Sequence, residues 1–139
     1  MLRLTPRRLA PVVVALLLGL PACGATESAS SEKFKGEQRA VAEVVEELAD
    51  AGGRKDADRI CKELFARALR EQGDRVAADC VEALRTSLDD ADAYDFKVES
   101  VTITGNRARA RVRSSSPRAG TIDFVREPRE WRIAAVDAG

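Results

Sequence analysis

Four arginines alternate with smaller residues in one short segment of the chain: Arg107, Arg109, Arg111 and Arg113. Successive side chains of a β-strand point to opposite faces, so this spacing predicts four guanidinium groups in one row. Such a row could bind anionic lipid head groups or the acidic polymers of a cell wall. It could instead be a solvated sheet face that discourages pairing with other chains. We favour the second interpretation, because Glu99 and Asp123 could neutralise the row.

Cys23 has the surroundings of a lipid-modified cysteine. Three arginines among the first residues are followed by an apolar run from Leu9 to Leu20, which is the pattern of a signal peptide. As a helix this run would be about 18 Å long, too short to span the ~30 Å hydrocarbon core of a membrane. The junction Leu20-Pro21-Ala22-Cys23 resembles the bacterial lipobox, whose cysteine is diacylated and becomes the first residue after cleavage. The alternatives are a plain secretory signal with a chance cysteine and, from Arg7-Arg8, twin-arginine export.

This interpretation divides the chain into three parts. Residues 1–22 form the signal peptide, residues 23–36 carry the acyl (palmitate-type) anchor and a flexible tether, and residues 37–139 form one folded domain. Two acyl chains attach a protein stably without a spanning helix. We therefore expect a lipoprotein on the extracytoplasmic face of the cell membrane.

The other two cysteines, Cys61 and Cys80, form an even pair in a chain that is predicted to leave the reducing cytosol. Both fall on apolar faces of predicted helices, so packing of the two segments would bring the thiols together. We expect a structural disulfide, worth roughly 3 kcal/mol for a loop of this length. The alternatives are two buried reduced thiols or a metal site, and two thiols without histidine make a poor zinc ligand set.

The composition disfavours most catalysis. The chain contains no histidine, which is the commonest general base and metal ligand. Three of the 23 basic residues lie in the leader, so the mature part carries 20 basic and 23 acidic residues, a balance that argues against binding of nucleic acid. Tyr94 and Asp95 could form an acid–base pair, but they precede a predicted strand, where they would at most line a rim. We expect that the protein is not an enzyme and that it binds no cofactor and no metal.

Apolar periodicity predicts helices in the first half of the mature chain. Over residues 37–51, apolar side chains recur at helical spacing, and Gly52-Gly53 ends the run. A second helix is predicted from about residue 55 to before Gly73, with an apolar stripe that runs to Phe65. A third is predicted over residues 74–88.

The second half changes to a period of two, which predicts four strands. A phase slip at Glu99-Ser100 indicates a bulge, and Gly105-Asn106 supplies a two-residue hairpin turn. A further turn is predicted around Pro128. The expected fold class is α+β, with three N-terminal helices packed on one face of a four-stranded antiparallel meander.

Four features, in this order, carry a resemblance to a known superfamily: the segment from Lys55 to Cys61, the second cysteine Cys80, the hairpin Val101 to Ala108, and the terminal Trp131-Arg132-Ile133. From Glu37 to Ala138 the chain resembles the nuclear-transport-factor-2-like (NTF2-like) superfamily, and specifically the small actinobacterial lipoproteins that carry such a domain. The resemblance implies a cone, in which helices close over a strongly curved sheet and often leave an apolar pocket. Some members are isomerases or dehydratases, and many have no catalysis.

Strand alternation predicts which side chains face the inside of this cone. The inward set includes Ala108 and Ile122 together with six candidate pocket-lining residues: Ile103, Ala110, Val112, Phe124, Trp131 and Ile133. All are apolar, whereas enzymes of this superfamily place polar acid–base groups inside the cone. The same residues could line a ligand pocket or simply form the core, and we favour the core.

Three functions remain open. The first is a non-catalytic, membrane-tethered domain that binds an unknown envelope protein. The second is a carrier or sensor of a small apolar ligand in the cone. An isomerase-like or dehydratase-like enzyme is the least expected.

Overall fold

The computed structural model describes residues 30–90, 95–114 and 119–137. Short turns and helices occupy the first half: η1 (Ser30–Lys33), α1 (Gly36–Gly53), α2 (Ala57–Arg59), the π-helical turn η2 (Ile60–Leu64), α3 (Arg67–Val76) and α4 (Cys80–Asp89). Four strands follow: β1 (Lys97–Thr104), β2 (Arg107–Arg113), β3 (Gly120–Glu127) and β4 (Glu130–Asp137). The strands form one antiparallel sheet in the order β1-β2-β3-β4, so the α+β meander expected from the sequence is present.

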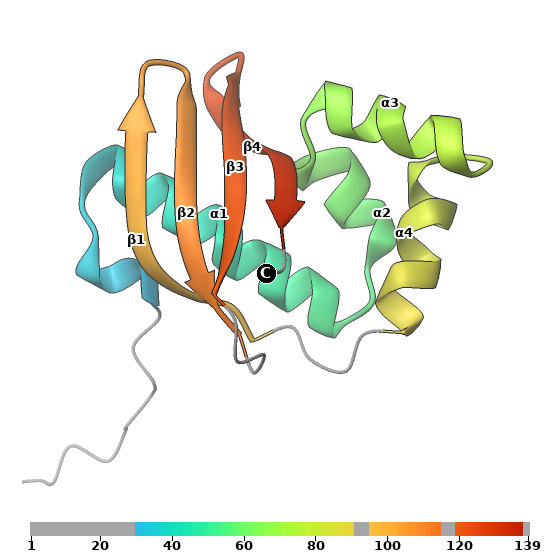
Figure 1. The fold of residues 1–139 in the computed structure, drawn as a ribbon, viewed down its shortest axis with the longest axis horizontal. Coiled ribbons are helices and arrows are strands. Elements are labelled where there is room, and N and C mark those ends of the chain that lie inside the picture. Colours follow the sequence, from blue (N-terminus) through green and yellow to red (C-terminus); the bar gives the residue numbers. More distant parts are fainter. Residues whose placement is uncertain (1–29, 91–94, 115–118, 138–139) are drawn as a thin grey trace, which may run out of the picture.

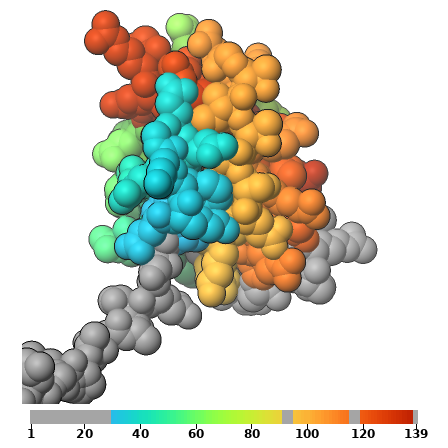
Figure 2. All heavy atoms as spheres, turned by 90° about the vertical axis from the view of Figure 1, so that its left-hand side faces the viewer, coloured from blue at the N-terminus to red at the C-terminus, as the bar shows by residue number. Residues whose placement is uncertain are grey.

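The helices are arranged differently from the prediction of three helices on one sheet face. Among the described helices, α1 alone crosses the face of the sheet, whereas α2, α3 and α4 gather beside β4 (Figure 1). Figure 2 shows η1 and α1, in blue and cyan, side by side with the first strands of the sheet. The cone therefore has one long helix behind the sheet and a helical subdomain at one edge.

The long helix α1 follows directly from the apolar spacing of its sequence. Val41 and Val45 are fully buried and Leu48 is 7% exposed, at the i, i+4 and i+7 positions of one face. These side chains join those of the sheet in a single hydrophobic core. The helix ends at Gly53, as the two glycines predict.

The predicted second helix divides after one π-helical turn. Asp56 caps its start by accepting a hydrogen bond from the backbone N–H of Arg59 at 3.0 Å. At Phe65 the chain becomes extended and bridges to Ile133 of β4, where the N–H of Ala66 donates to the Ile133 carbonyl at 2.8 Å. Pairing with the sheet edge therefore ends the helix at Leu64, beside the last residue of its apolar stripe, and not closer to Gly73.

The prediction of one helix over residues 74–88 is wrong. Residues up to Val76 belong to α3, and α4 begins at Cys80. Asp79 accepts a hydrogen bond from the N–H of Glu82 at 2.8 Å, and Asp74 accepts one from the N–H of Cys80 at 2.9 Å. The two aspartates satisfy backbone donors that a continuous helix would use, so they stabilise a new helix start.

The details predicted for the sheet are confirmed. The register of β1 on β2 shifts between Val98 and Ser100, which is the bulge at Glu99, and Thr104 pairs with Arg107 across a two-residue turn. Only Gly105 of that turn has a positive φ, +59°, so the strain falls on the residue that tolerates it. A second bulge, between Asp123 and Phe124 of β3 and their partners on β4, was not predicted.

The folded domain begins at Ser30, earlier than the boundary expected at residue 37. Ser31 is 3% exposed and packs on α1. Its N–H and hydroxyl donate to the Glu46 carboxylate at 2.7 and 2.8 Å. Seven residues that the sequence places in the tether therefore belong to the described domain.

Candidate functional site

The pair Cys61 and Cys80 forms a disulfide, with Cα atoms 6.1 Å apart. Cys61 lies in η2 and Cys80 is the first residue of α4, and the two are 2% and 7% exposed. The bond ties the helical subdomain to the turn that ends against β4. Burial of both sulfurs agrees with the structural role predicted from the sequence.

The six candidate pocket residues lie in the hydrophobic core, or against it. Ile133 and Ala110 are fully buried, and Phe124 is 1% exposed. Val112 and Trp131 belong to the same cluster, and Ile103 is half-buried at its margin. These side chains pack against Val41 and Val45 of α1, so the inner face of the sheet and the helix fill the space between them.

The arginine row lies on the opposite face of β2, as predicted. Burial alternates strictly along the strand, with all four arginines exposed and the residues between them buried. Arg109 donates to both carboxylate oxygens of Asp123, at 2.6 and 3.0 Å. Glu99 lies 2.6 Å from Arg113 and 3.6 Å from Arg111. The two expected acidic residues therefore neutralise part of the row.

The pairing changes the acidity of Asp123. The hydrogen bond from Arg109 lowers the pKa of this carboxyl below its ordinary value of 3.8, with smaller contributions from the charges of Arg109 and Arg107. Asp123 also raises the pKa of Arg109. Both shifts favour the charged pair, which keeps the guanidinium and the carboxylate in one orientation.

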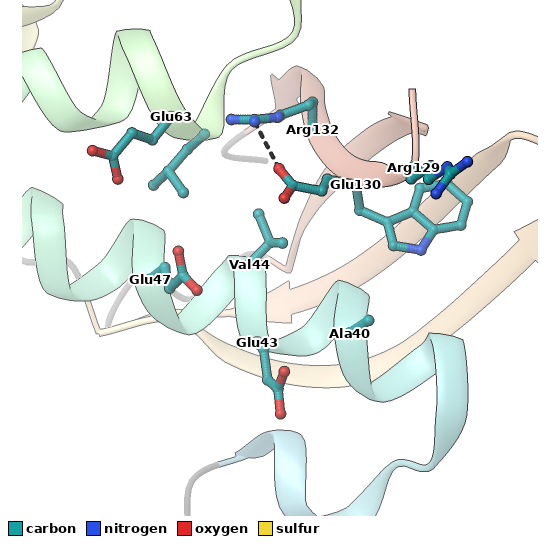
Figure 3. A pocket seen from close by; sticks show the side chains of 10 residues that line it. Ala40, Glu43, Val44, Glu47, Glu63, Arg129, Glu130 and Arg132 are labelled. Carbon is teal, nitrogen blue, oxygen red and sulfur yellow. Dashed lines mark hydrogen bonds and ion pairs between the residues drawn. The ribbon is translucent and has the colours of Figure 1, made fainter. Parts of the chain in front are cut away.

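A groove of about 470 Å³ lies between α1, η2 and the β3-β4 hairpin (Figure 3). Its walls are mostly charged and come from three elements: Ala40, Glu43, Val44, Glu47, Glu63, Leu64, Arg129, Glu130, Trp131 and Arg132. Figure 3 shows Glu43 and Glu47 on the α1 wall opposite Glu130 and Arg132 of the hairpin. Among the residues predicted as pocket lining, Trp131 alone reaches this groove.

The carboxylates of this groove are exposed and paired with arginines. Glu43 lies 3.0 Å from Arg39, and Glu130 lies 2.8 Å from Arg132. Arg59 lies 3.6 Å from Glu47 and 3.5 Å from Glu63. These carboxylates and guanidinium groups form a charged lining that is open to solvent.

Trp131 lines the groove and forms part of the core. Its side chain is 7% exposed, and the guanidinium carbon of Arg126 lies 4.6 Å from the ring centroid. Arg126 in turn pairs with Glu37 at the start of α1. The tryptophan is therefore held between the core and a fixed arginine, as a core residue with one edge at the surface.

Sequence reasoning did not identify Glu43, Glu47 and Glu63 as neighbours. The spacing of Glu43 and Glu47 places both on one face of α1, but nothing in the sequence indicates that the β3-β4 hairpin lies opposite that face. Asp95 is exposed before β1. Tyr94, the lipidation candidate Cys23 and the predicted leader lie outside the described residues.

Within residues 30–90, 95–114 and 119–137, no group of His, Cys, Asp and Glu side chains could hold a metal ion. In the same ranges, no helix is long and apolar enough to cross a membrane.

Comparison with known proteins supports the fold. No protein-family model matches the chain, and no curated protein matches it. The chain is similar to the solved structure of a designed NTF2-like protein, with a TM-score of 0.52 and 17% sequence identity over 71% of this chain and 96% of the designed one. This likeness concerns the fold alone, and the fold of the domain is NTF2-like.

Proposed function

We propose that the mature chain is a lipid-anchored, extracytoplasmic domain that binds a partner in the cell envelope and carries out no reaction. One observation supports the absence of catalysis most directly. The interior of the cone is packed with apolar side chains, and Phe124, Ile122 and Ile133 are each at most 1% exposed. A reaction inside the cone would need polar groups and space for a substrate at this place.

The buried polar residues of the described ranges also support a domain without catalysis. Within the described ranges, Ser31 is the one buried polar residue, and its hydrogen bonds to Glu46 serve to hold η1 on α1. The exposed charged groups of the groove at Trp131 suit contact with another macromolecule. A carrier of apolar ligands would need a chamber where these core side chains pack.

The proposed compartment is supported by the disulfide together with the leader. Disulfides persist in oxidising compartments and are rare in the cytosol. The Cys61–Cys80 bond therefore agrees with export, and Cys23 follows an apolar run that fits a lipoprotein signal.

The anchor is tested by replacing Cys23→Ala in the full chain and expressing it in a host with lipoprotein processing. We expect wild type in salt-washed membranes, with an intact mass that includes acyl chains, and the variant in the soluble fraction. Ser28→Ala, in the same segment, is the matched control and should behave as wild type. A Cys23→Ala protein that is cleaved yet stays in salt-washed membranes would contradict the anchor.

The interaction role is tested by native mass spectrometry on the soluble Cys23→Ala protein. We expect a mass without ligand, because the core is filled. A reproducible added mass that is lost on denaturation would favour the carrier over the interaction domain.

A further inference from the structure

The outer face of the sheet is uncovered in the described part of the chain. The helix α1 packs on the opposite face, and the helical subdomain lies beyond β4 (Figure 1). Three arginine side chains of this outer face are 65%, 64% and 70% exposed, those of Arg109, Arg111 and Arg113. A row of guanidinium groups is therefore free to contact a flat partner.

The carboxylates on this face do not balance the arginines. Asp123 is engaged by Arg109, and Glu99 is shared between Arg111 and Arg113. The charge of Arg107 also acts on Asp123. The four arginines of β2 therefore face Asp123 and Glu99, and the strand register places Asp137 of β4 on the same face. Lys33 of η1 adds a further cation, because its Nζ donates to the Glu99 carbonyl at 3.4 Å. The face keeps a net positive charge.

The other side of the domain is acidic. The helix α1, behind the sheet, carries one arginine, Arg39, and five carboxylates: Glu37, Glu43, Glu46, Glu47 and Asp50. The strand β2 carries four arginines and no acid. An electric field from an anionic surface would therefore turn the outer sheet face toward that surface.

The polypeptide connection to Cys23 starts at the same end of the sheet. The Oγ of Ser30 accepts a hydrogen bond from the N–H of Val98 at 3.3 Å. The next residue, Glu99, pairs with Arg113. Six residues lie between Cys23 and Ser30, and the seven Cα-to-Cα steps between them span at most about 25 Å. A strand as long as β2 measures about 23 Å, so the whole row lies within reach of the anchored membrane.

From these observations we infer that the outer sheet face, with the row from Arg107 to Arg113, docks on anionic phospholipids of the membrane that holds the Cys23 anchor. The inference rests on the lipid attachment proposed above. Basic residues near an anionic leaflet each strengthen binding, and the short connection keeps the row close to the leaflet, where screening by salt is weakest. Docking would orient α1 and the groove at Trp131 away from the bilayer.

The test measures flotation of the non-lipidated Cys23→Ala protein, without its leader of residues 1–22, with vesicles at low salt. Phosphatidylcholine vesicles with one third phosphatidylglycerol are compared with pure phosphatidylcholine vesicles. We expect binding to the anionic vesicles alone. The double variant Arg107→Ser with Arg111→Ser should weaken that binding about thirty-fold, because each basic residue near an anionic surface contributes about fivefold.

Two further double variants show whether a loss of vesicle binding comes from the charge of this face, from the total charge of the protein or from misfolding. Arg54→Ser with Arg67→Ser removes two exposed arginines from the helical side and should leave vesicle binding within about twofold of wild type. Arg107→Lys with Arg111→Lys should restore binding, since an ammonium group also serves as a point charge. Circular dichroism checks that each variant is folded.

Three results would overturn the inference: equal binding to both kinds of vesicle, an equal loss in the two arginine-to-serine doubles, or a loss of binding to soluble polyphosphate without any loss on vesicles. The last would assign the row to an anionic polymer. A separate measurement tests the anchor itself: if the intact mass of the wild-type protein lacked acyl chains, the proposed lipid attachment would be wrong.

Discussion

Arg109 and Asp123 show how a surface row of like charges is made compatible with a stable sheet. Neighbouring guanidinium groups on one strand face repel one another, and a carboxylate on the adjacent strand at the paired position relieves part of that repulsion. The contact is bidentate, which fixes the direction of Arg109. The remaining positive charge belongs mainly to Arg107 and Arg111. Substitution of these two residues should therefore have the largest effect on binding to an anionic surface.

Replacing Asp123→Asn should lower the free energy of unfolding by less than about 1 kcal/mol at neutral pH, because the pair is partly exposed. The folded-state pKa of Asp123 is depressed, so its contribution is complete above its ordinary value of 3.8 and is lost as the pH falls through the lower folded value. Urea unfolding at neutral pH and at a pH below the lowered folded-state pKa of Asp123 measures the difference between wild type and variant. The difference should disappear at the lower pH.

The Arg109→Ser background is the control for this prediction. Without its guanidinium partner, Asp123→Asn should no longer affect stability, because the interaction that lowers the carboxyl pKa is already absent. An Asp123→Asn effect that persists at low pH or in this background would mean that the carboxylate stabilises the sheet in another way.

At the scale of elements, α3 and α4 pack together through a close contact between Gly73 of α3 and Cys80 of α4. A Cβ at Gly73 would lie 2.9 Å from the Cα of Cys80 and 3.1 Å from its Cβ. The disulfide to Cys61 also holds Cys80 in place. The backbone therefore has little freedom to move away from an added methyl group.

Gly73→Ala should destabilise the domain by about 1–3 kcal/mol, the usual range for overpacking, although alanine favours helices. Gly53→Ala at the end of α1 is the matched control, because an added Cβ there meets nothing within 4 Å. That variant should remain within about 1 kcal/mol of wild type. Thermal and urea unfolding of both proteins measure the effect, and equal stabilities would contradict the proposed contact.

Local signals predicted the sheet better than the helices. The bulge at Glu99 and the turn at Gly105 follow from residues that are neighbours in sequence, and both are confirmed. The division of the predicted helix at Cys80 depends on Asp74, which caps it from six residues upstream, and on the disulfide. Such contacts need the tertiary arrangement, which an apolar period does not contain.

The candidate site shows the same limit. Alternation along β2 correctly placed the arginines outside and the apolar residues inside. The groove at Trp131 joins Glu47 of α1, Glu63 of η2 and Arg132 of β4, which are far apart in sequence. The groove forms because α1 crosses the sheet next to the β3-β4 hairpin, and the sequence of no single segment predicts this arrangement.

For the whole molecule, the attachment of η1 to α1 fixes where the domain ends and the connection to Cys23 begins. Glu46 accepts hydrogen bonds from the backbone N–H and the hydroxyl of Ser31, and its Oε1 lies 3.4 Å from the hydroxyl oxygen of Ser30. Release of η1 would lengthen the connection and let the domain turn away from the membrane. Glu46 therefore controls the reach of the proposed tether.

Glu46→Ala should expose the segment around Lys33 and Lys35 to trypsin, with cleavage about fivefold faster or more. The reason is that the buried N–H of Ser31 loses its acceptor, at a cost of about 1–3 kcal/mol, and proteolysis follows the population of the opened state. Glu47→Ala, whose side chain contacts Arg59 and not η1, is the matched control and should be cleaved at the wild-type rate. Mass spectrometry of a digestion time course on the full chain identifies the cut sites. If cleavage after Lys33 were equally slow in both variants, packing of Phe34 against the core would hold η1 in place, and the length of the tether would not depend on Glu46.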